Sequence, residues 1–183
     1  MIKLNELNLA FVDLEMTGLD ENIHEIIEIA VIIYNQKEDK IIKEWETKVS
    51  PINLETADQK AIKINGYINN PGLYSAGLKS SLIKFNSLTK DCIIIGQNID
   101  FDLRFIKKNM SDFGIEPHFD FRKLDLMSLA WWLVKDTDIP GLSLKKLCDH
   151  FGITNVGEHS ALIDCRRTFE VYERILNLYK GKQ

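Results

Sequence analysis

Acidic side chains at the end of an apolar segment have the types and spacing of a metal site. Asp13 and Glu15 are two residues apart, and on a β-strand they would point to the same face. Two carboxylates this close repel each other unless a proton or a cation lies between them. Thr17 and Gly18 break the strand pattern, which places the acidic pair at a strand end beside a turn.

Two further acidic clusters come later in the chain. Asp100 and Asp102 follow the apolar segment 92–96, where a strand should end and a helix begin, and parallel sheets often bind ligands at such a point. Asp100 could cap that helix and Asp102 would lie in its first turn, so each has a structural alternative. Asp164 interrupts an apolar stretch, and a buried carboxylate needs a partner. His159 can converge with Asp164 if it lies on a loop before the helix that carries Asp164.

These clusters together predict metal-dependent hydrolysis. They supply Asp13, Glu15, Asp102 and Asp164, with His159 beside them. Oxygen ligands without cysteine or several histidines favour Mg²⁺ or Mn²⁺ over zinc. Four carboxylates can hold two divalent ions about 3.5–4 Å apart, which would clamp the attacking and leaving oxygens of a phosphodiester. A histidine with an ordinary pKa of about 6.5 can accept the proton of the attacking water.

The hydrophobic pattern predicts an α/β domain that would position these clusters. Residues 8–15, 25–35 and 40–49 have the composition of strands, and their short connections make them antiparallel neighbours. A buried strand at 92–96 and a weaker one at 119–124 alternate with helices, which gives a mixed sheet flanked by helices. Helices are expected over 55–64, 73–88, 102–113, 126–135, 143–151 and 160–180. The chain shows no repeat or linker, so residues 1–183 are expected to form a single domain.

Some polar residues have plainer interpretations. Asp125 precedes the apolar run 126–134 and is predicted to be a helix N-cap. Asn98 could stabilise its own turn through its side chain. Arg166 and Arg167 are predicted to lie on a solvated helix face.

Composition and charge restrict the choice of partner. The chain of 183 residues is 45% hydrophobic and 27% charged, as is usual for a soluble globular protein. A net charge of −4 argues against coating nucleic acid by general electrostatics, although two divalent ions would add +4 and give zero. A nucleic-acid substrate would therefore be held locally. No membrane-length apolar run or secretory signal is visible, and three cysteines without paired spacing predict a reducing cytoplasm.

The three clusters, in order, resemble the motifs of a known enzyme group. Asp13-x-Glu15-x-Thr17-Gly18, Asn98-x-x-Phe101-Asp102 and His159-x-x-x-x-Asp164 resemble the exonuclease motifs of the DEDDh group. That group belongs to the DnaQ-like (RNase T-like) 3′–5′ exonucleases, which have a ribonuclease H-like fold. The resemblance spans residues 8–176 and implies metal ligation by Asp13, Glu15, Asp102 and Asp164, with His159 as general base. It also implies substrate contacts, for which the candidates are Leu14, Met16, Thr17 and Asn98.

Features of two subfamilies are combined in this chain. Residues 13–20 and the compact length look like oligoribonuclease, whereas residues 48–67 and the second motif look more like the proofreading exonuclease of DNA polymerase III. The chain has no tail after the last helix, so no stable polymerase partner is expected, while a homodimer is compatible. We expect removal of nucleotides from the 3′ end of single-stranded DNA or short RNA. The alternatives are an oligoribonuclease specialised for very short RNA and a catalytically silent nucleic-acid-binding module.

Overall fold

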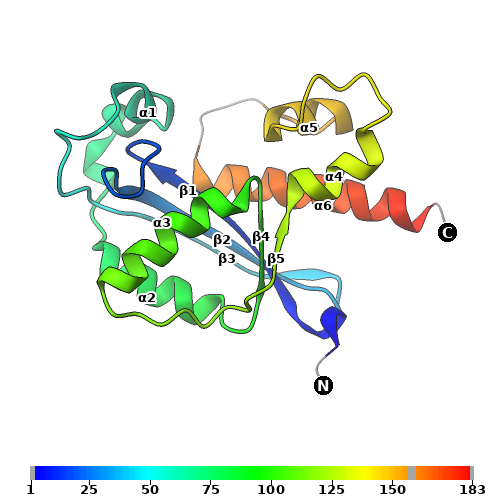
Figure 1. Cartoon of the computed structure of the whole chain (residues 1–183), viewed down its shortest axis with the longest axis horizontal. Coiled ribbons are helices and arrows are strands. Elements are labelled where there is room, and N and C mark those ends of the chain that lie inside the picture. The colour runs from blue at the N-terminus through cyan, green and yellow to red at the C-terminus, as the bar shows by residue number, and fades with distance from the viewer. Residues whose placement is uncertain (1–2, 156–159, 182–183) are drawn as a thin grey trace.

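A mixed five-stranded sheet forms the centre of the described part of the chain (Figure 1). The structure is a computed structural model, and it describes residues 3–155 and 160–181. The strands are β1 (Asn8–Met16), β2 (Ile26–Asn35), β3 (Lys40–Lys48), β4 (Ile93–Gly96) and β5 (Lys123–Asp125), in the sheet order β3-β2-β1-β4-β5. β1, β2 and β3 pair antiparallel, while β4 pairs parallel with β1 and β5. The predicted antiparallel meander followed by parallel strands is therefore confirmed.

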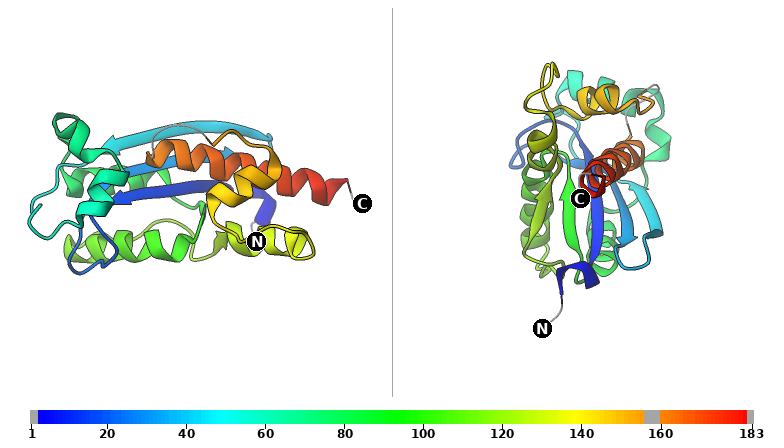
Figure 2. Two further views of the ribbon diagram at one scale, coloured as in Figure 1. Left: turned by 90° about the horizontal axis from the view of Figure 1, so that it is seen from above. Right: turned by 90° about the vertical axis from the view of Figure 1, so that its right-hand side faces the viewer.

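Helices cover both faces of this sheet. α2 (Leu78–Leu88) and α3 (Ile99–Asp112) pack on one face, and α6 (Ala161–Lys180) runs along the strands on the other (Figure 2). α4 (Leu126–Val134) and α5 (Leu144–Phe151) pack against α6 through a third apolar cluster. The remaining elements are α1 (Gln59–Ile64) and the short 3-10 turns η1 (Leu4–Glu6), η2 (Tyr67–Asn69) and η3 (Pro71–Leu73).

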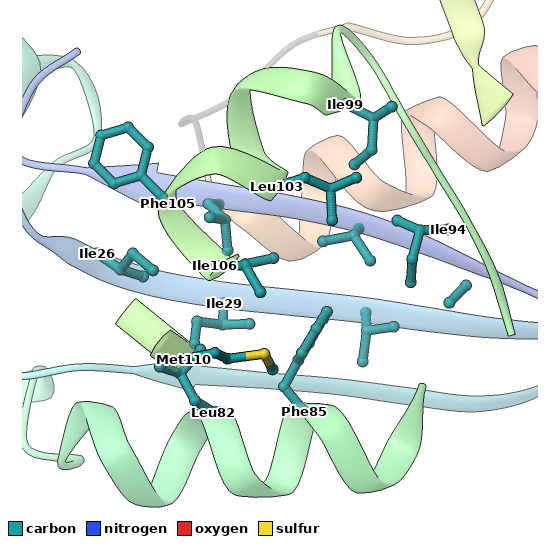
Figure 3. Packing of buried hydrophobic residues seen from close by; sticks show 14 of the residues in the cluster. Ile26, Ile29, Leu82, Phe85, Ile94, Ile99, Leu103, Phe105, Ile106 and Met110 are labelled. Atoms are coloured by element: carbon teal, nitrogen blue, oxygen red, sulfur yellow. The ribbon is translucent and has the colours of Figure 1, made fainter. Parts of the chain in front are cut away.

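The alternation of β1 divides its side chains between two cores. Val12 and Leu14 point towards α2 and α3, whereas Phe11 points towards α6. Figure 3 shows the first core, in which side chains from α2 and α3 close over the sheet, among them Leu82, Phe85, Phe105, Ile106 and Met110. Because side chains alternate along a strand, Asp13 and Glu15 share the face of Phe11 and therefore point towards α6.

Two predicted helices begin later than expected. The helix expected over 55–64 starts at Gln59, because the side chain of Asp58 caps it by accepting from the N–H of Lys60. The helix expected over 73–88 starts at Leu78, because Ala76 forms a parallel β-bridge with Val49. The first cause is a local cap, whereas the second is a long-range contact that a local pattern does not reveal.

Two further observations concern the length of the helices and the state of the cysteines. No helix within residues 3–155 and 160–181 combines the length and the apolar character that a membrane crossing requires. Cys92, Cys148 and Cys165 are buried free thiols.

Candidate active site

Three carboxylates converge at the C-terminal end of β1. Asp13 and Glu15 point from β1 towards α6, and Asp164 lies in the first turn of that helix. One carboxylate oxygen from each lies within 4.8 Å of the others. The side chain of Ser160 caps the helix by accepting from the N–H of Ile163, which fixes where the first turn begins. The predicted convergence of the first and third acidic clusters is thus observed.

Asp102 joins this group from α3. Its side chain is 5% exposed, and its Oδ1 accepts a hydrogen bond from the backbone N–H of Leu14 at 3.1 Å. Asp100 is exposed and forms an ion pair with Lys123, away from the acidic group. The N-cap of α3 is Asn98, so the alternative that Asp100 caps this helix is wrong. The structure thus places Asp102, and not Asp100, beside β1.

The pKa values of Asp13, Glu15 and Asp102 reflect their burial first and, for Asp13 and Glu15, the charges of neighbouring carboxylates. Burial, followed by the charge of Glu28, raises the pKa of Glu15 to about 8. Burial raises the pKa of Asp102 to about 7. The pKa of Asp13 is also raised well above its usual range, first by burial and then by the charge of Asp102. A bound cation would favour the charged form of each group.

The donor set fits a hard divalent metal ion. The converging atoms are carboxylate oxygens, the ligands that Mg²⁺ and Mn²⁺ prefer, and burial together with neighbouring carboxylates raises the pKa values of Asp13 and Glu15. Within the described ranges, the grouped ligand atoms come from Asp13, Glu15 and Asp164, with no cysteine among them. An acidic cluster able to hold a divalent ion is therefore present.

A buried arginine lies next to this cluster. Arg167 is 5% exposed, and its Nη1 lies 2.7 Å from Oδ1 of Asp164. The prediction of a solvated helix face is wrong for Arg167. The prediction is confirmed for Arg166, which is exposed and forms an ion pair with Glu44 of β3. The structure therefore assigns the two adjacent arginines to different surroundings.

The predicted substrate residues differ in their surroundings. The side chain of Leu14 is buried in the core beside α3, and Met16 is partly buried. Thr17 is fully buried, and its Oγ1 accepts from the N–H of Glu25. Asn98 is exposed and has a positive φ of 55°, a conformation that asparagine tolerates better than most residues. The substrate roles of these residues stay predictions.

Two further predictions on polar residues have different outcomes. Asp125 is the predicted N-cap of α4, and its side chain accepts from the N–H groups of Met127 and Ser128. It also accepts from the N–H of Ile99, so it joins the starts of α3 and α4. His159, the predicted general base, lies outside the described residues, and its role stays a prediction.

Sequence reasoning missed Glu28, the residue opposite Glu15 in the register of β1 and β2. The residue is 2% exposed, and its side chain accepts hydrogen bonds from three donors. The available signal was a carboxylate within the isoleucine-rich run 26–33, the same type of signal that identified Asp164.

Comparison with known proteins gives the family. A model of an exonuclease family, RNase T, matches residues 10–172. Ribonuclease T of Shewanella denitrificans is 29% identical, over 93% of this chain and 80% of that protein. DNA polymerase III subunit epsilon of Aquifex aeolicus is 30% identical, over 90% of this chain and 78% of that protein. The chain spans only 12% of another relative, the PolC-type DNA polymerase III of Thermotoga maritima, to which it is 29% identical.

Solved structures confirm the fold. Exonuclease I of E. coli in complex with single-stranded DNA superposes with a TM-score of 0.80 at 18% identity, over 97% of this chain and 42% of that one. The nuclease domain of 3′hExo, a DEDDh family member bound to rAMP, gives a TM-score of 0.75 at 16% identity, over 96% and 94% of the two chains. With the family model matching most of its length, this chain belongs to the RNase T family of exonucleases.

Proposed function

We propose that this exonuclease removes nucleotides from the 3′ end of single-stranded DNA or short RNA by two-metal phosphodiester hydrolysis. The observation that carries the proposal is the convergence of Asp13, Glu15 and Asp164 within 4.8 Å, with Asp102 held to the same strand. Relatives named ribonuclease T and DNA polymerase III subunit epsilon support an RNA and a DNA substrate, respectively. The neighbour solved with single-stranded DNA supports an unpaired substrate strand.

The four carboxylates would hold the metal, as two Mg²⁺ or Mn²⁺ ions. Asp13, Glu15 and Asp164 offer converging oxygens, and Asp102 approaches from α3. Bound ions would supply Lewis-acid chemistry by stabilising the negative charge that develops on the phosphate. Arg167 holds Oδ1 of Asp164 and so orients the carboxylate.

Hydrolysis at a 3′ end has a defined proton balance. Water attacks the phosphorus of the last phosphodiester, and the bond from phosphorus to the 3′ oxygen of the preceding nucleotide breaks. That oxygen takes up a proton and becomes the new 3′ hydroxyl, while the terminal nucleotide leaves with a 5′ phosphate. In this proposal His159 accepts the proton of the attacking water, and Asn98 and Met16 contact the terminal nucleotide.

The organisation of the protein forms a further part of the proposal. Residues 1–183 would act as a single exonuclease domain, which the continuous sheet supports. Cytoplasmic location, independence from a polymerase partner and the possibility of a homodimer stay predictions.

A 5′-labelled oligonucleotide incubated with Mn²⁺ tests the proposal. Single-stranded DNA, a short RNA and a dinucleotide should be compared side by side, and a ladder of shortened products that disappears with EDTA is expected. Binding of the oligonucleotide without any product would instead identify a silent binding module. Release of the label alone would indicate a phosphomonoesterase, and either result would reject the proposal.

A further inference from the structure

A buried carboxylate that lies outside the metal-binding group connects several elements around it. Glu28 is opposite Glu15 in the antiparallel register, so both side chains point to the face of the sheet that α6 covers. Its exposure is only 2%, and the cost of burying a charge requires hydrogen-bonding partners. Three donors supply them, and they come from β3, from the segment after η3 and from α6.

Two of these donors share one oxygen of Glu28. Tyr74 Oη donates to Oε1 at 2.7 Å, and Nζ of Lys48, the residue opposite Glu28 on β3, donates to the same oxygen. Nζ of Lys48 also lies 4.9 Å from the ring centre of Tyr74. The ammonium group thus offsets the buried charge of Glu28 and holds the tyrosine against it.

The third donor is the first residue of α6. The backbone N–H of Ala161 donates to Oε2 of Glu28 at 3.2 Å. This N–H belongs to the first turn of the helix, where backbone donors have no partner within the helix, and a carboxylate there is also favoured by the helix dipole. Asp164 follows three residues later, so a shift of the helix start would move Asp164 relative to Asp13.

We propose that Glu28 is a positioning residue that fixes the start of α6 and thereby places Asp164 for metal binding, an inference that rests on the proposed function. Both oxygens of Glu28 already accept hydrogen bonds, and the converging group consists of Asp13, Glu15 and Asp164 without it. Glu28 therefore acts on the metal through the position of a helix.

The chemistry of the three donors explains why a carboxylate is required. A carboxylate accepts hydrogen bonds on both oxygens, whereas glutamine has one oxygen and an amide that donates. In Glu28→Gln the amide would face either the N–H of Ala161 or the pair formed by Lys48 and Tyr74. In Glu28→Asp the charge remains, but the side chain is one methylene shorter and cannot span both groups.

Two variants and one matched control test the proposal in the full chain. Mn²⁺ affinity is measured by calorimetry without substrate, and kcat and KM are measured with a labelled oligonucleotide over a range of Mn²⁺ concentrations. Glu28→Gln and Glu28→Asp should each weaken Mn²⁺ binding about tenfold or more, as for other residues that orient metal ligands. Both variants should lower kcat by a larger factor than they change KM. Excess Mn²⁺ should recover part of the lost cleavage rate.

Glu44→Gln is the control, because Glu44 also connects a strand to α6, through Arg166, but does not contact the helix start. It should keep the Mn²⁺ affinity of the wild type. A folded Glu28→Asp variant with wild-type Mn²⁺ affinity would overturn the inference. It would show that a negative charge at position 28 is enough for metal binding, even when the side chain is too short to contact both groups of donors. Loss of one bound Mn²⁺ per chain would also overturn it, by making Glu28 a ligand.

The same measurements separate this inference from the proposed function. If the Glu28 variants lose Mn²⁺ affinity while the wild-type protein cleaves no oligonucleotide, the positioning role stands and the proposed function fails. If Glu28→Gln does not fold, Glu28→Asp still decides the question, because it keeps the ion pair with Lys48.

Discussion

The backbone N–H of Leu14 donates a hydrogen bond to Oδ1 of Asp102 at 3.1 Å. Leu14 lies between Asp13 and Glu15 on β1, so this bond joins the first turn of α3 to the acidic end of the strand. One oxygen of Asp102 is held by the backbone, and the other can serve a metal ion. The residue thus links the sheet and the proposed metal site.

Exchange of the two neighbouring aspartates for asparagine separates their roles. Asp102→Asn should lower the cleavage rate on the order of 10²-fold or more, because a neutral amide is a weaker ligand for the cations that would stabilise the negative charge of the transition state. The fold should remain, since the amide oxygen can still accept from Leu14. Asp100→Asn is the matched control and should keep most of the activity, because Asp100 pairs with Lys123 at the surface. If Asp100→Asn instead abolished cleavage, the assignment of Asp102 as the metal ligand of α3 would be wrong.

The crowded carboxylates predict that the metal-free protein loses stability as the pH rises. Glu15 and Asp102 have pKa values of about 8 and about 7 in the folded protein, against about 4 in the unfolded chain. Between these limits the folded state binds more protons than the unfolded state, so the free energy of unfolding falls with increasing pH. Urea unfolding in EDTA, from about pH 4 to about pH 8, measures this trend.

Added Mn²⁺ should reverse that trend. Metal binds the deprotonated carboxylates of the folded state, so it should raise the melting temperature more at high pH than at low pH. Mg²⁺ provides a second metal for comparison. A metal-free protein that becomes more stable as the pH rises through this window would contradict the assigned pKa shifts.

The adjacent arginines offer a matched pair of variants. Arg167→Met should destabilise the protein by about 3 kcal/mol, because it leaves the partly buried carboxylate of Asp164 without its ion pair to residue 167. Arg166→Met removes a partly exposed ion pair with Glu44 and should cost about 1 kcal/mol or less. Chemical denaturation of both variants measures the difference. Equal losses would show that the ion pair of Arg167 has no greater effect than a surface contact.

His159→Ala tests the proposed general base. The variant should bind Mn²⁺ and substrate like the wild type while kcat falls on the order of 10²–10⁴-fold. The wild-type rate should rise with pH through the pKa of His159, and this limb should disappear in the variant. An undiminished rate would make His159 a bystander, and loss of Mn²⁺ binding by calorimetry would make it a ligand.

The sequence predicts most of the sheet, because strand signals are local. β1 and β2 carry near-continuous apolar runs, and their observed bounds differ from the predicted ones by one residue at most. The start of α2 was predicted too early because the preceding residues have long-range roles. Tyr74 donates to Glu28, and Ala76 bridges Val49, and no local pattern encodes either contact.

The site residues show the same division between local and distant causes. The paired acids of β1 are predictable from the alternation of a strand, and Asp164 from its apolar neighbours. The ion pair of Arg167 is local, because Asp164 lies three residues earlier on α6, but the burial of Arg167 depends on how that helix packs in the fold, which its position on the helix does not show. Glu28 could have been identified as a carboxylate within an apolar run, but its three donors come from elements that are distant in sequence.

The origin of the carboxylates in the first strand and the last helix has a consequence for biosynthesis. Chains are made from the N-terminus, and contacts between distant residues form late in folding. A ribosome that has made β1 and α3 has produced Asp13, Glu15 and Asp102, but the cluster lacks Asp164 until α6 emerges. A chain that stops before α6 therefore lacks the assembled acidic cluster, and the capacity to cut nucleic acid arises only after α6 has been made.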